Sequence, residues 1–178
     1  MRIESGQFKG RSLPRVRRAR PVPARLKRSL FMVLEGRLEG AEVLDLFAGV
    51  GGLGLEALSR GATHVTFVDD DAGALRALRL WLEKAEAGDR GTTLKLDLVR
   101  RPLPPGPYDV VFADPPFEHW DDDRGRELVA RAAAVLGPEG CLVLKLPAAV
   151  ELDAGEGWRL ERRKVFGQVA WALDMPTK

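Results

Sequence analysis

A chain of 178 residues with 45% hydrophobic content can bury one sizeable core, so we expect a single domain, or one domain with a small appendage. The only cysteine, Cys141, excludes an intrachain disulfide and favours a reducing compartment, which predicts a cytoplasmic protein. No uncharged apolar run approaches the ~18 residues of a membrane span, and no apolar stretch follows the basic N-terminus, so we expect neither a membrane anchor nor a secretory signal.

The charges are unevenly distributed. The net charge is +2, but residues 1–28 hold ten basic side chains and one acidic side chain, so residues 29–178 are net acidic. A basic segment on an acidic body favours binding of a polyanion, with nucleic acid first, over a merely solubilising tail. We expect residues 1–36 to form a nucleic-acid-binding extension and residues 37–178 the main domain. The candidate contacts are Arg11, Arg15, Arg17, Arg18, Arg20, Arg25 and Arg28.

The first predicted elements are a small hairpin over residues 2–14 and a helix over residues 20–38. Pro23 falls near the first turn of the helix, where a missing N–H costs nothing. Arg25 and Arg28 share one face, because residues three apart are neighbours on a helix. The adjacent face is apolar and is formed by Leu26, Leu30, Val33 and Leu34.

From residue 42, short aliphatic runs alternate with helical stretches, which predicts an α/β, Rossmann-like fold with a seven-stranded, mostly parallel sheet. Residues 98–107 contain too many prolines for a crossover helix. The last two strands flank Gly167 and form an antiparallel hairpin. The predicted strands are 42–47, 64–69, 92–97, 108–114, 141–147 and the hairpin 158–175, and the helices lie near 52–60, 71–87 and 123–136.

The loop after the first predicted strand has the pattern G-x-G-x-x-G at Gly49, Gly51 and Gly54, and Asp69 ends the next strand. These are elements of a dinucleotide-binding fingerprint, which alone is a weak signal. Asp45 argues against a dinucleotide, because a carboxylate at the end of the first strand would repel a pyrophosphate at the helix N-terminus. A carboxylate at this position would instead favour a ligand that carries a positive charge.

The form Asp-x-Phe-x-Gly-x-Gly, at Asp45, Phe47, Gly49 and Gly51, resembles the first motif of class I methyltransferases, which use S-adenosylmethionine (AdoMet). That cofactor has no phosphate and carries a sulfonium and an ammonium group, so a carboxylate attracts it. The resemblance implies that Asp45 lies near the methionyl end of AdoMet and that the two glycines let the cofactor approach the backbone.

Further acidic residues follow the next two strands. Asp69, at the strand tip, is the best candidate for binding the two ribose hydroxyls, with Asp70 as its neighbour in the cofactor site. Asp71 is better explained as a helix N-cap. Asp97 occupies the place where this class often accepts a hydrogen bond from the adenine amino group, and the alternative is an ordinary loop carboxylate.

The corner Asp114-Pro115-Pro116-Phe117 follows the fourth predicted strand, beside the switch point where open α/β sheets bind ligands. It suits methyl transfer to the exocyclic amino group of a base. The Asp114 carboxylate and the Pro115 carbonyl can accept the two N–H bonds, and the prolines fix that carbonyl. Phe117 offers a flat face on which the base can stack. A strand-ending turn would explain this motif alone, but not its pairing with the Asp45 loop.

The target base must leave its stack, or already be exposed in a loop, to reach this corner. Next along the chain, we expect Trp120 to pack and His119 to be solvated, and the alternative is that both line the pocket. His64 is the only other histidine, so no metal site is predicted.

Over nearly its full length the chain resembles the bacterial methyltransferases that modify the 2-amino group of guanine 966 in 16S ribosomal RNA. The most specific segments are the Gly-x-(aromatic)-x-Gly-Arg-x-Leu-Pro run at residues 6–14 and the run at residues 164–171. The resemblance implies a monomeric, cytoplasmic, metal-independent enzyme with AdoMet as cofactor and S-adenosyl-L-homocysteine as product. Its partner would be 16S rRNA within small-subunit particles.

The chain departs from the family's usual Arg-Pro-Thr followed by Thr-Asp, because Val22-Pro23-Ala24 follows Arg20-Pro21 and the hydroxyl and carboxylate contacts of that turn are missing. Three alternatives remain. The same corner would serve an adenine-N6 methyltransferase acting on DNA or RNA. The chain could also be a non-catalytic RNA-binding ribosome-assembly factor, or an NAD-linked oxidoreductase.

Overall fold

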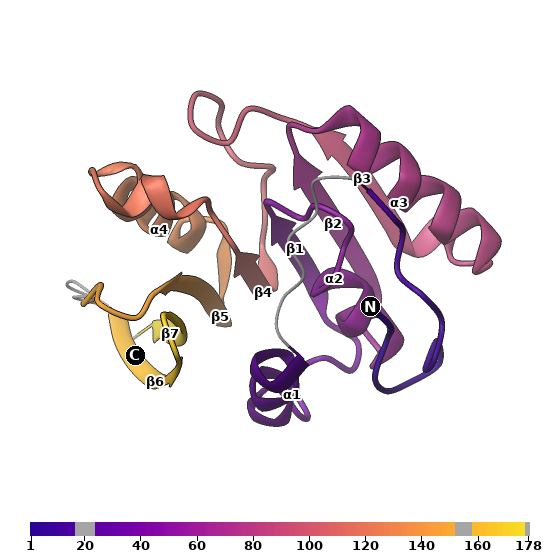
Figure 1. The fold of residues 1–178 in the computed structure, drawn as a ribbon, viewed down its shortest axis with the longest axis horizontal. Coiled ribbons are helices and arrows are strands. Elements are labelled where there is room, and N and C mark those ends of the chain that lie inside the picture. Colours follow the sequence, from indigo (N-terminus) through magenta and orange to yellow (C-terminus); the bar gives the residue numbers. More distant parts are fainter. Residues whose placement is uncertain (17–23, 152–157, 177–178) are drawn as a thin grey trace.

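The computed structural model describes residues 1–16, 24–151 and 158–176. Seven strands form one sheet in the order β3-β2-β1-β4-β5-β7-β6, so the predicted α/β fold is confirmed (Figure 1). The elements are α1 Ala24–Val33, β1 Glu42–Leu46, α2 Gly54–Ser59, β2 His64–Asp69, α3 Ala72–Lys84, η1 Gly88–Arg90, β3 Gly91–Lys95, β4 Tyr108–Ala113, η2 Phe117–Trp120, α4 Arg124–Ala133, β5 Leu136–Pro147, β6 Trp158–Phe166 and β7 Val169–Pro176.

Strands β3, β2, β1, β4 and β5 run parallel, and β7 pairs antiparallel with both β5 and β6. The C-terminal antiparallel hairpin is therefore confirmed. Strand β5 begins five residues earlier than predicted, because Leu136 pairs with Tyr108 before a register shift. Residues 98–107 contain no helix, as their prolines predicted.

The helices cover the two faces of the sheet separately (Figure 1). Helices α1, α2 and α3 pack on one face, in a core that includes Val43, Phe67 and Phe112. Helix α4 packs on the other face against alternate strand residues such as Leu44 and Val111. Strands covered on both faces are mostly apolar, which is why Val43, Leu44 and Leu46 of β1 and residues 110–113 of β4 are buried and apolar. Their carboxyl ends meet at one edge of the sheet. Among the described residues, no helix is both long and apolar enough to cross a membrane.

The N-terminal segment, residues 1–16, packs on the main domain through the buried side chains of Ile3, Phe8 and Leu13. The predicted hairpin is reduced to one antiparallel bridge between Arg2 and Ser12. These side chains belong to the same core as α1 and the sheet, so the division of the chain at residue 36 stays a prediction.

Helix α1 ends at Val33, five residues before the predicted end at Leu38. The chain turns at Gly36, whose φ of +83° a helix cannot accommodate. The predicted start of this helix lies outside the described residues. Its buried face contains Leu26 and Leu30, as predicted, and also the charged Lys27.

Candidate active site

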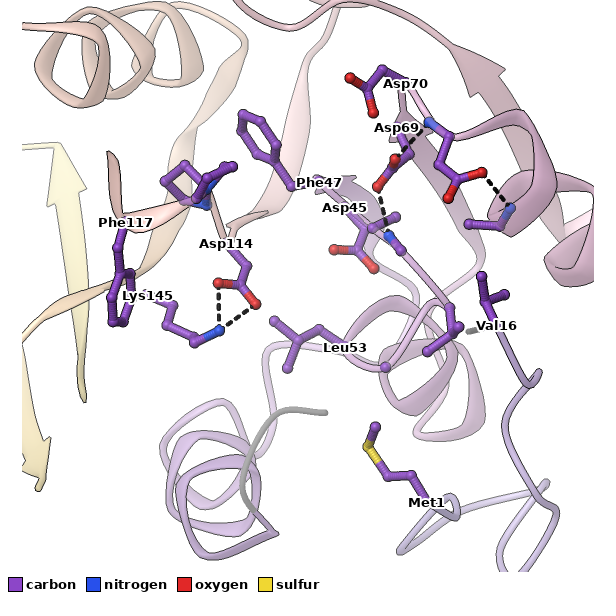
Figure 2. A pocket seen from close by; sticks show the side chains of 18 of the residues that line it. Met1, Val16, Asp45, Phe47, Leu53, Asp69, Asp70, Asp114, Phe117 and Lys145 are labelled. Atoms are coloured by element: carbon purple, nitrogen blue, oxygen red, sulfur yellow. Dashed lines mark hydrogen bonds and ion pairs between the residues drawn. The ribbon is translucent and has the colours of Figure 1, made fainter. Parts of the chain in front are cut away.

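A cavity of about 620 Å³ lies at the carboxyl ends of β1, β2 and β4 (Figure 2). Its walls are the glycine loop after β1, the start of α3, the corner after β4 and a side chain of β5. Met1 and Val16 of the N-terminal segment also line it. The topology therefore forms this cavity at the place where parallel α/β sheets bind ligands.

Most of the predicted site residues meet in this cavity. From the cofactor set, Gly51 and Asp97 are not among its lining residues. The lining includes Asp45, Phe47, Gly49, Asp69, Asp70, Asp114, Pro115, Pro116 and Phe117.

Asp45 lies one residue before the end of β1, deep in the cavity, and is 2% exposed. Its Oδ2 accepts a hydrogen bond of 2.9 Å from the N–H of Gly54. Burial raises the pKa of Asp45 to about 7, and repulsion from the nearby carboxylates of Asp114 and Asp69 adds to this, while the Gly54 hydrogen bond opposes it. A cationic ligand would favour the charged form of this carboxylate.

The surroundings of Gly54, the third glycine of the loop, explain why a glycine is needed there. A Cβ at this position would lie 2.4 Å from Cε1 of Phe67 and 2.8 Å from Oδ2 of Asp45. Glycine therefore permits close packing of α2 on the sheet and leaves room for the Asp45 carboxylate, which accepts from the N–H of Gly54.

Asp69 connects the loop to the end of β2. Its Oδ2 accepts a 2.7 Å hydrogen bond from the N–H of Gly49, and its Oδ1 accepts one of 2.9 Å from the N–H of Asp71. Burial raises the pKa of Asp69 despite these two bonds. The predicted N-cap is confirmed, because Asp71 accepts hydrogen bonds from the N–H groups of Gly73 and Ala74.

Asp97 lies outside the cavity. Its Oδ1 accepts hydrogen bonds from the N–H groups of Val99 and Arg100, and its side chain is exposed. A carboxylate that follows a strand can cap its own turn instead of facing the ligand. The sequence position alone did not distinguish these two environments.

The Asp114 corner lies beside the glycine loop because β1 and β4 are neighbours in the sheet. Leu46 pairs with Ala113, and the N–H of Asp114 donates to the carbonyl of Leu46 over 3.4 Å. Burial raises the pKa of Asp114, although the ammonium group of Lys145 opposes this shift.

Lys145, on β5, is the residue that sequence reasoning missed. Its Nζ lies 2.6 Å from Oδ1 and 2.7 Å from Oδ2 of Asp114, and the two side chains face each other in the cavity (Figure 2). The available signal was a lone cation in the apolar run "CLVLKLP". A charge inside a buried strand requires a partner, but the sequence did not show which one.

His119 was predicted to be solvated, and this was wrong. It is buried in η2, and its ring meets the ring of Phe47 edge to face at a centroid distance of 5.7 Å. Burial lowers the pKa of His119. In the described part of the chain, no cluster of His, Cys, Asp or Glu could hold a metal ion.

The basic residues near the N-terminus have different environments. Arg25 is exposed, and Arg28 is largely exposed with a long ion pair of 3.7 Å to Glu4. Arg11 donates to the carbonyl of Lys84 and lies over the ring of Phe8. Arg15 is exposed, whereas Arg17, Arg18 and Arg20 lie outside the described residues.

The comparisons with known proteins agree with this geometry. Residues 1–174 match the model of the family described as Conserved hypothetical protein 95. The chain is 34% identical to Ribosomal RNA small subunit methyltransferase D of Escherichia coli, over 97% of this chain and 88% of that one. It is 37% identical to Putative rRNA methyltransferase YlbH of Bacillus subtilis, over 97% of both chains.

A solved structure of the putative methyltransferase yhhF from Escherichia coli superposes with a TM-score of 0.85 at 32% identity, over 99% of this chain and 97% of that one. The fold is thus the one expected for class I methyltransferases. The chain belongs to the Conserved hypothetical protein 95 family and is a relative of the bacterial ribosomal RNA small subunit methyltransferase D proteins.

Proposed function

We propose that this protein is an AdoMet-dependent methyltransferase that methylates the exocyclic N2 amino group of a guanine in 16S ribosomal RNA. The observation that carries this proposal is the meeting of Asp45 and Asp114 in one cavity, at the ends of neighbouring strands. The first belongs to the loop proposed to bind the cofactor, and the second to the corner proposed to bind the base. The relatives named as rRNA methyltransferases support the same reaction class.

The cavity suits the charges of AdoMet. Its described lining contains the carboxylates of Asp45, Asp69 and Asp70: Asp45 would attract the cationic methionyl end, and Asp69, with Asp70 beside it, would bind the ribose hydroxyls. A dinucleotide fits less well, because the N–H of Gly49, which a pyrophosphate would need, already donates to Asp69. This contact disfavours the oxidoreductase alternative.

AdoMet would supply an electrophilic methyl group and leave as S-adenosyl-L-homocysteine. At the corner, the Asp114 carboxylate and the Pro115 carbonyl would accept the two N–H bonds of the target amino group and orient its lone pair. Phe117 would stack on the base. The nitrogen that gains the methyl group loses one proton, which Asp114 or water can accept. No other base is required.

The RNA backbone would lie along the N-terminal basic residues. Arg25 and Arg28 expose their guanidinium groups on α1, whose neighbouring face is packed on the sheet. Arg11 and Arg15 add positive charge on the segment that reaches the cavity, and Arg17, Arg18 and Arg20 follow in sequence. The same corner would serve an adenine-N6 enzyme, so the identity of the modified nucleoside is the decisive property.

The proposal is tested with Asp114→Ala and Asp114→Asn, compared with the exposed control Asp89→Asn. We expect both Asp114 variants to bind AdoMet in calorimetry but to lose methyl transfer to 16S rRNA by at least about 100-fold, since one positioned polar group is commonly worth that much. The control should retain its activity. Turnover by Asp114→Ala comparable to that of the wild type would refute the role of the corner.

A further inference from the structure

Resting on the proposed function, we propose that Lys145 is a positioning residue for methyl transfer: it keeps the Asp114 carboxylate charged and fixed, and shares it with the target amino group. The observation behind this role is a short contact of the Lys145 ammonium group with both carboxylate oxygens of Asp114. Nζ of Lys145 lies 2.6 and 2.7 Å from the two carboxylate oxygens, and both side chains line the cavity (Figure 2).

The surroundings of Asp114 make this cation necessary. Asp45 on β1 and Asp69 on β2 line the same cavity, and Glu118 of η2 lies at its wall. His119 of η2 faces Phe47 instead. Among the described lining residues, Lys145 is the only basic side chain. Removing it would leave Asp114 partly buried among like charges.

A charged carboxylate is needed because the target amino group is a hydrogen-bond donor. A protonated Asp114 would turn one oxygen into a donor and would weaken the clamp. Burial favours this neutral form, whereas the lysine opposes it. The ion pair therefore keeps the Asp114 carboxylate charged and able to accept a hydrogen bond from the target amino group.

Lys145 need not leave when the base binds. A carboxylate has about four lone-pair sites, and the lysine occupies two of them, one on each oxygen. The remaining sites can accept an N–H of the base. Lys145 and the base can thus donate hydrogen bonds to Asp114 at the same time, and the lysine does not block the site.

The position of Lys145 is set by the sheet. Its strand, β5, pairs with β4 up to Leu144 and with β7 at Trp171, whose side chain is buried. Trp171 of β7 pairs with Lys145, and the pairing with β4 ends one residue before it, so the ammonium group of Lys145 reaches Asp114 from a strand that is held within the sheet. Such support favours a positioning role over a chance surface contact.

The test compares Lys145→Met, Lys145→Arg and the exposed control Lys95→Met in single-turnover methyl transfer to 16S rRNA from pH 5 to 9. We expect Lys145→Met to shift the acid limb of the rate profile upward by about one to three pH units, since loss of an adjacent opposite charge moves a carboxyl titration by that amount. Lys145→Arg should restore most of the wild-type profile, and Lys95→Met should match the wild type.

Two outcomes of these rate measurements would overturn the proposal. One is a rate for Lys145→Met that equals the wild type, or that falls by the same factor at every pH. The other is weakened AdoMet binding with an unmoved acid limb, which would assign Lys145 to the cofactor's carboxylate.

A second readout separates this proposal from the proposed function. The carboxyl carbon of Asp114, assigned by NMR with Asp114→Asn, should titrate at higher pH in Lys145→Met than in the wild type, without RNA or AdoMet. Inactive wild-type protein would refute the methyltransferase proposal alone. An unchanged titration in an active enzyme would refute only the role of Lys145.

Discussion

Replacing Lys27 by methionine should destabilise the protein and release its N-terminal segment. Lys27 is 1% exposed and Glu56 is 0% exposed, and their Nζ and Oε2 atoms are 2.9 Å apart. Lys27 also donates to the carbonyl of Arg2 over 3.0 Å. The Glu56 carboxylate accepts three further hydrogen bonds, from Arg60 and from the N–H groups of Glu4 and Ser5. This cluster attaches residues 2–5 to α1 and α2.

Removing one member of a buried ion pair costs about 3 to 5 kcal/mol. Because Arg60 remains beside Glu56, we expect Lys27→Met to lie near the lower end, at about 3 kcal/mol. For a protein of this size, that is a fall in Tm of about 6 to 12 °C. The exposed Arg28→Met is the matched control and should cost less than about 1 kcal/mol.

The assays are chemical denaturation for the free energy of unfolding and hydrogen exchange for the amides of residues 3–13, which should exchange faster in Lys27→Met. Burial would raise the pKa of Glu56, but the Glu4 N–H, Lys27 and Arg60 outweigh it and hold the pKa below the usual value near 4.5. Glu56 therefore contributes stability that is present above pH 4.5 and is lost as the pH falls below it. Lys27→Met within about 0.5 kcal/mol of the wild type would refute this reasoning.

Because the pKa of Asp45 is raised to about 7, its carboxyl group is mostly protonated at pH 6, and binding of cationic AdoMet should release protons. In calorimetry the heat of binding should therefore depend on the ionisation enthalpy of the buffer. A heat that is independent of the buffer would count against an ionised Asp45 in the complex. Gly54→Ala should lose about 1 to 3 kcal/mol in denaturation and weaken AdoMet binding, because the added Cβ overlaps an aromatic ring of β2; unchanged stability would contradict this packing. Replacing Arg25 and Arg28 together by glutamine should lower the slope of log affinity for RNA against log salt concentration by about 0.7 to 0.9 per lost phosphate contact. The control Arg126→Gln, on α4, should leave this slope unchanged. Equal slopes for all variants would exclude α1 from the RNA interface.

The fold could be predicted from sequence because local signals agreed with the global topology. Apolar runs ending in Asp45, Asp69 and Asp114 mark three strand ends, and parallel strands bring such ends to one edge. The N-terminal segment was less predictable. Its basic residues predicted a nucleic-acid-binding extension, whereas the contacts of Ile3 and Phe8 with the core depend on partners far away in the sequence.

The charged contacts across the sheet were also beyond sequence reasoning. Lys145 and Asp114 are 31 residues apart, and only the pairing of β4 with β5 makes them neighbours. Lys27 looked like one more cation of the basic segment, yet it is buried against Glu56. A charge pattern indicates where cations are in the sequence, but their partners follow from tertiary packing.

The central claim is that the Asp114 corner positions the amino group of a guanine in 16S rRNA for methylation. The most direct measurement is nucleoside mass analysis of unmethylated 16S rRNA, free and in small-subunit particles, after incubation with the protein and isotope-labelled AdoMet. We predict label in N2-methylguanosine with the wild type and none with Asp114→Ala. Label in N6-methyladenosine, or no labelled nucleoside from either substrate, would contradict the claim.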